Sequence, residues 1–98
     1  MNYDFEWDPA KAATNLRKHG VGFDEAATVF LDPNALSRFD DGHSEDEDRW
    51  VTLGVSSGAR LIVVCHVFRE VDNDTATVRI ISSRKATKAE TEQFGRQT

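Results

Sequence analysis

Cysteine is almost missing from this chain of 98 residues, in which Cys65 is the single example. One thiol excludes an internal disulfide framework and a zinc site built from several thiolates. Cys65 lies in a short apolar run, a setting typical of an unreactive thiol in a reducing compartment. The sequence therefore predicts neither a secreted disulfide scaffold nor a cysteine nucleophile.

Long hydrophobic runs are missing as well. The longest covers residues 61–65, whereas a membrane-spanning helix needs about 20 apolar residues. The N-terminus has neither the basic nor the apolar segment of a signal peptide. A domain typically has about 100–150 residues, so we expect one cytoplasmic domain over residues 1–98.

Several motifs that carry chemistry are also absent. No G-x-S-x-G nucleophile turn, no phosphate-binding G-x-x-x-x-G-K loop and no G-x-G-x-x-G turn occurs. The three histidines fall in three different predicted elements, and the acidic stretch at residues 40–48 does not fit the spacing of a calcium loop. We expect no metal and no cofactor.

Acidic residues are in surplus, but unevenly so. Seventeen acids against twelve bases give a net charge of −5, which by itself argues against a nucleic-acid partner. Residues 1–48 hold twelve acids and four bases, a net charge of −8, whereas residues 49–98 hold five acids and eight bases, a net charge of +3. The chain is thus an acidic half followed by a mildly basic half.

Helix signals dominate the first third of the chain. Asp8 and Pro9 mark a helix start, and Gly20 is suited to end that helix in a left-handed conformation. A second helix is indicated by the i, i+3, i+4, i+7 spacing of apolar residues from Phe23 to Phe30. Both helices follow a short strand-like alternation at residues 5–8.

Strand signals dominate the remainder. Strands are predicted at residues 35–39, 50–55, 60–69 and 75–83, and a capping-box pattern predicts a C-terminal helix over 88–94. The last three strands are joined by short turns and should form an antiparallel meander. We therefore predict an α+β fold, a small antiparallel sheet of three to five strands with two N-terminal helices and one C-terminal helix.

Arginines occur within and at the ends of the predicted strands. Arg79 interrupts an apolar strand, and Arg49, Arg60 and Arg69 mark strand ends. Antiparallel folding should bring several of them together, and such a cluster binds phosphates. The alternative is that these arginines cap the sheet and pair with carboxylates of the acidic half. Residue types alone leave both interpretations open.

A family resemblance adds to this interpretation. The segments FEWDPAK (5–11), KHGV (18–21), FDEA (23–26), HS (43–44) and VRIISSRKAT (78–87) occur in this order. In these segments the chain resembles the BrnT toxins of bacterial type II toxin–antitoxin systems, over roughly residues 5 to 90. The resemblance implies a fold similar to that of the RelE-type ribonucleases.

The resemblance also implies a function and its partners. BrnT toxins are metal-independent endoribonucleases that cleave RNA and inhibit translation, and a BrnA-like antitoxin neutralises them. The antitoxin supplies the DNA-binding domain, so operator DNA is contacted only through a hetero-oligomer. Two alternatives stay open: a non-catalytic binding module that acts with its antitoxin in operon autoregulation, and an acidic interaction domain without nucleic acid.

Site residues follow by position from the same resemblance. Arg79 and Arg49 are expected to stabilise the phosphorane, and His43 and Glu47 are candidates for proton transfer. The residues expected to hold the RNA backbone are Lys18, His19, Arg84 and Lys85. His19 has an alternative as a residue of the helix C-terminus. Relatives with the RelE-like fold often carry a tyrosine where this chain has Phe94, which has no hydroxyl. We expect Phe94 to anchor the C-terminal helix in the core.

Overall fold

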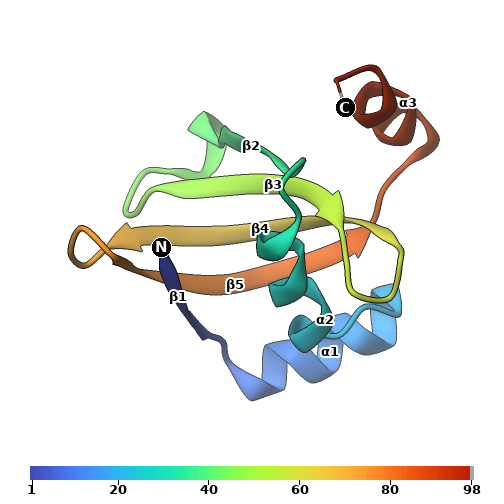
Figure 1. Ribbon diagram of the computed structural model, residues 1–98. Coiled ribbons are helices and arrows are strands. Elements are labelled where there is room, and N and C mark those ends of the chain that lie inside the picture. Colours follow the sequence, from blue (N-terminus) through green and yellow to red (C-terminus); the bar gives the residue numbers. More distant parts are fainter. Residues whose placement is uncertain (98) are drawn as a thin grey trace.

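The computed structural model describes residues 1–97, and all the predicted helices and strands are present in that range (Figure 1). The helices are α1 (Pro9–His19), α2 (Phe23–Thr28) and α3 (Lys88–Gln97). The strands are β1 (Asn2–Glu6), β2 (Leu36–Phe39), β3 (Arg49–Val55), β4 (Leu61–Glu70) and β5 (Thr75–Lys85). Single 3-10 turns lie at Val29–Leu31 and Asp41–His43. The predicted α+β class is confirmed, and none of these helices is long and apolar enough to span a membrane.

The five strands form one sheet in the order β1-β5-β4-β3-β2. Strands β2 to β5 are antiparallel to their neighbours, as predicted, but β1 pairs with β5 in parallel. The expectation of a wholly antiparallel sheet is therefore wrong at this edge. No short turn joins β1 to β5, so no turn fixes its direction. In the observed pairing, Tyr3 and Phe5 both reach the ring of Phe30, at centroid distances of 5.7 and 5.4 Å.

Three predicted helix ends are confirmed by their hydrogen bonds and backbone angles, namely both ends of α1 and the start of α3. The Asp8 carboxylate accepts hydrogen bonds from the backbone N–H groups of Ala10 and Lys11, and Gly20 ends α1 with a φ of 70°. At the start of α3, the Glu90 N–H donates to the Thr87 hydroxyl at 3.2 Å, while the Thr87 N–H donates to the Glu90 carboxylate at 2.8 Å. This is the reciprocal pattern of a capping box.

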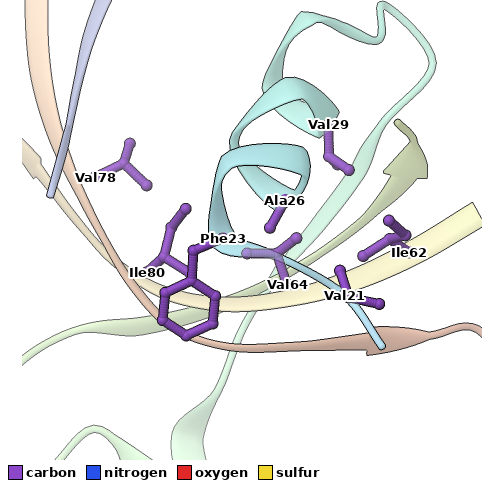
Figure 2. Close-up of a cluster of buried hydrophobic side chains, with 8 residues drawn as sticks. All are labelled: Val21, Phe23, Ala26, Val29, Ile62, Val64, Val78 and Ile80. Atoms are coloured by element: carbon purple, nitrogen blue, oxygen red, sulfur yellow. The ribbon is translucent and has the colours of Figure 1, made fainter. Parts of the chain in front are cut away.

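The hydrophobic core lies between one face of the sheet and the segment around α2. Figure 2 shows this cluster, which consists of Val21, Phe23, Ala26, Val29, Ile62, Val64, Val78 and Ile80. All eight side chains are buried. The cluster residues on β4 and β5 occupy every second position, because successive side chains of a strand point to opposite faces. One face of the sheet is thereby committed to the core.

Helices α1 and α2 both pack on this core face, whereas α3 stands apart from them beyond the end of β5 (Figure 1). No residue of α3 among those described is fully buried. Phe94, which we expected to anchor α3 in the core, is half-buried and lies outside the buried cluster. That expectation is wrong, since α3 borders the opposite, more open face instead.

Candidate active site

Arg49 and Arg79 project from the same end of the open sheet face. Arg49 begins β3 and pairs with Val67 of β4, and Val67 in turn pairs with Arg79 of β5. Directly paired residues point to the same face, and two strand spacings separate the two arginines by about 10 Å. The register therefore confirms that folding brings these two arginines to one place, as the antiparallel pattern predicts.

The acidic loop between β2 and β3 brings Glu47 to the same end. Its carboxylate forms an ion pair with the guanidinium of Arg79, with both side chains partly exposed. Glu6 of β1 pairs with Arg79 in the sheet and adds a second carboxylate beside it. The arrangement gives Arg79 a carboxylate partner that an incoming phosphate would have to replace.

His43 lies on the rim of the same loop. Its Nδ1 is 3.0 Å from Oδ2 of Asp40, and its side chain is 71% exposed. Because Nδ1 faces Asp40, Nε2 is the ring nitrogen left for a substrate. The Asp40 carboxylate thus orients the imidazole in the way that an acid–base histidine requires.

Ser44 attaches this loop to the start of β3. Its hydroxyl donates to the Asp40 carbonyl at 2.6 Å and accepts from the Arg49 N–H at 3.0 Å. Ser44 and Asp40 position His43 and Arg49, and neither was among the predicted site residues. The one signal for Ser44 was its place next to His43 in the family-like segment HS.

Two surface clefts meet at Glu47. One, of about 340 Å³, is lined by Glu6, Glu47, Asp48, Val67, Phe68, Arg69, Thr77 and Arg79. The other, of about 290 Å³, is lined by Gly42, His43, Glu45, Asp46, Glu47 and Arg49. All four residues predicted to be catalytic therefore line this pair of clefts, and Arg69 is an additional arginine that the prediction did not include.

Arg49 differs from Arg79 in its contacts. Its Nε is buried and makes no hydrogen bond within residues 1–97, and the residue forms no ion pair with any described carboxylate. A buried N–H of a charged guanidinium without an acceptor is costly. An anion beside Arg49 would supply that acceptor.

The four predicted RNA-binding residues lie toward the other end of the molecule. Lys18 and His19 are exposed at the C-terminus of α1, on the helix-covered side, while Arg84 and Lys85 end β5. Arg84 is about 16 Å along the strand from Arg79, for five residues at the usual rise. The structure thus separates the eight predicted residues into two groups.

Arg84 is engaged in a structural contact. Its guanidinium donates two hydrogen bonds to the Glu90 carboxylate, at 2.7 and 3.0 Å. The pairing with Arg84 lowers the pKa of Glu90 to about 2, helped by the Thr87 N–H and opposed by partial burial. Arg84 therefore ties the end of β5 to the start of α3, and any phosphate contact must share it with Glu90.

His66 lies on the core face of the sheet and is not part of this site. It is buried on the core face, with Nε2 2.8 Å from the Thr52 hydroxyl and its ring edge-on to Phe30 at 4.8 Å. Burial lowers its pKa to about 4, and the backbone of Val67 offsets part of the shift. His66 is therefore neutral at physiological pH. Within residues 1–97, no three histidine, cysteine or carboxylate side chains gather closely enough to hold a metal ion.

The sequence and the fold of this chain both resemble those of known proteins. The family model described as the ribonuclease toxin BrnT of type II toxin–antitoxin systems matches residues 7–90. Among solved structures, the chain is similar to the ribonuclease toxin BrnT of Brucella abortus, with a TM-score of 0.59 over 90% of this chain and 100% of that one. The two sequences are 20% identical, so this likeness concerns the fold. No curated protein matches the sequence significantly.

Proposed function

We propose, from the premise that this chain belongs to the BrnT family of ribonuclease toxins of type II toxin–antitoxin systems, that it is itself a metal-independent endoribonuclease. The single observation that carries the proposal is the meeting of two arginines, a histidine and a carboxylate at one end of the sheet. Metal-free cleavage of RNA needs these groups: a base, an acid and fixed positive charge.

The reaction follows from what each group offers. The Glu47 carboxylate takes the proton of a ribose 2′-hydroxyl, and the 2′-oxygen attacks the adjacent phosphorus. The bond from phosphorus to the 5′-oxygen breaks, and the His43 imidazolium donates a proton to that oxygen. The products are a 2′,3′-cyclic phosphate and a 5′-hydroxyl. Arg49 and Arg79 stabilise the charge that develops on the phosphorane.

The ion pair between Glu47 and Arg79 sets the order of events. An RNA phosphate displaces the carboxylate from the guanidinium and takes over its hydrogen bonds. The displaced carboxylate then stays close to the phosphate that replaced it, where it can accept a proton. Arg49 contributes a buried Nε that has no other acceptor in the described chain.

The remaining predicted residues extend the same proposal. Lys18, His19, Arg84 and Lys85 hold the RNA backbone at a distance from the reaction centre, and Phe94 takes no part in proton transfer because it has no hydroxyl. Cleavage of RNA by this chain would inhibit translation. The antitoxin partner that the family implies would be BrnA-like, would form a hetero-oligomer with this chain and would contact operator DNA on its behalf.

The decisive experiment is cleavage of a 5′-labelled RNA by the purified protein in the presence of EDTA. We expect defined fragments with cyclic phosphate ends, and a loss of about 10²–10³-fold in cleavage rate for Arg79→Ala, the usual effect of removing one charge-stabilising donor. Arg17→Ala is the matched control, because Arg17 lies on α1 away from the clefts. Circular dichroism establishes that both variants are folded.

Two results would contradict the proposal. A folded Arg79→Ala variant that cleaves as fast as the wild type removes Arg79 from the site. Intact RNA with the wild-type protein, together with operator binding by its complex with the antitoxin, would favour the alternative of a non-catalytic binding module.

A further inference from the structure

We propose that Arg38 and Arg69 bind RNA backbone phosphates on either side of the reaction centre, so that a single strand crosses the open sheet face along the line Arg38–Arg49–Arg69. This inference rests on the proposed function. It names Arg38, which neither the family resemblance nor the sequence pattern assigned, and it gives a specific role to Arg69, which the sequence pattern counted only among the arginines at strand ends. It assigns Arg49 a central place on the path, with Arg79 beside it.

The first observation is that all the strand arginines share one face. Arg38 pairs with Val51, which pairs with Cys65, and Arg69 pairs with Thr77. By the alternation of side chains, these positions belong to the face opposite the core. The five arginines on this face are Arg38, Arg49, Arg69, Arg79 and Arg84.

The second observation is their spacing. On β4, Arg69 lies two residues from the position opposite Arg49. On β2, Arg38 also lies two residues from the position opposite Arg49, but in the other direction along the sheet. Diagonal neighbours of this kind are about 7–8 Å apart. The three arginines thus form a straight diagonal over three adjacent strands. Their spacing is comparable to that of successive phosphates in an extended single strand.

The third observation is that the diagonal is not neutralised by the protein. Within residues 1–97, Arg38, Arg49 and Arg69 form no ion pair, whereas Arg79 pairs with Glu47 and Arg84 with Glu90. Arg38 and Arg69 are exposed. Exposed arginines that lack carboxylate partners can accept phosphates without first breaking an ion pair.

The shape of the surface follows the same line. Arg69 lines the cleft of about 340 Å³ together with Arg79. Arg38 lines a further cleft of about 500 Å³, along Leu36, Val51, Leu53, Val63 and the exposed side of α3. Arg49, which lines the cleft of about 290 Å³, lies between these two arginines. A strand that enters beside α3 can therefore pass the site and leave along β4.

Acidic residues mark the limit of the path. Asp4 and Glu6 of β1 pair with Thr77 and Arg79 and so lie on the same face, at its far edge. Their charge repels phosphate, which on this face keeps the RNA on the strands from β5 to β2. An acidic protein segment would also be drawn to this face. The regular spacing of the three arginines, which is comparable to that of successive phosphates, favours RNA.

The test measures binding of a fluorescent, non-cleavable 2′-O-methyl single strand of twelve nucleotides by anisotropy, at several salt concentrations. We expect Arg38→Gln and Arg69→Gln each to weaken binding about 3–10-fold and to reduce the slope of log K against log salt by about 0.7, one phosphate contact. Arg17→Gln is the matched control and should match the wild type.

The outcomes separate this inference from the proposed function. Cleavage of RNA by the wild type, with both diagonal variants behaving like Arg17→Gln, would overturn the path and leave the nuclease intact. Normal RNA binding combined with loss of antitoxin binding in these variants would overturn it too, and would make the face a protein-docking surface. A wild type that neither binds nor cleaves RNA would refute both.

Discussion

Replacing Asn15 by alanine is expected to destabilise the fold more than any change on the surface of α1. Asn15 is buried, and its amide nitrogen donates to the carbonyls of Val21 and Ser83 at 3.0 and 2.9 Å. Its amide oxygen accepts from the Ser83 N–H at 3.1 Å. The pairing of β1 with β5 ends at Arg79, so Asn15 takes the place of a strand at the edge of β5 beyond it.

The magnitude follows from the groups left without partners. Truncation at Asn15 removes the acceptor of one buried N–H and the donor to two carbonyls. Each buried polar group that loses its partner costs about 1–3 kcal/mol. Water reaching part of the gap lowers the sum, so we expect a loss of about 3 kcal/mol. For a domain of this size that corresponds to a fall in Tm of about 12–24 °C.

Urea unfolding followed by far-ultraviolet circular dichroism measures this loss. Thr14→Ala is the control, because Thr14 is the exposed neighbour on α1 and such surface changes stay within about 0.5 kcal/mol. If Asn15→Ala proves as stable as Thr14→Ala, the amide is not a structural bridge between α1 and β5, and the reasoning fails.

Two further predictions concern the core. Because the folded protein binds a proton at His66 only near pH 4, whereas an unfolded histidine does so near pH 6.5, stability should fall by at most about 3 kcal/mol as pH drops between these values. Stability measured against pH should show no such loss in His66→Leu, and an equal loss would contradict the assignment. Gly54→Ala should cost about 1–3 kcal/mol in urea unfolding, because its Cβ would lie 2.8 Å from Cγ1 of the buried Val29. Gly95→Ala in α3, where a Cβ meets no atom within 4 Å, is the control and should not destabilise.

The net charge of the whole chain does not describe the charge of its open sheet face. A net charge of −5 argues against nucleic acid, yet the five strand arginines stand on one face of the sheet. The division into an acidic and a basic half pointed in this direction without locating the face. The sheet register locates it, because alternation assigns each side chain to one face.

The part of the site that the sequence predicted came mainly from the family resemblance. The resemblance named His43, Glu47, Arg49 and Arg79, which line adjoining clefts. It also named Arg84, which lies away from Arg79 at the end of β5. It did not indicate that Arg84 forms a bidentate ion pair with Glu90. An ion pair between a strand end and a helix start depends on how the chain turns between them.

The sequence by itself determined the local structure of this protein. The cap at Asp8, the left-handed Gly20 and the capping box of Thr87 and Glu90 involve groups within four residues of one another, so short-range chemistry decides them. Tertiary structure alone decided the parallel pairing of β1, the bridge from Asn15 to Ser83 across 68 residues and the diagonal of arginines. These features depend on strand register. Register is fixed only when the alternating apolar side chains of distant segments are buried together against the helices.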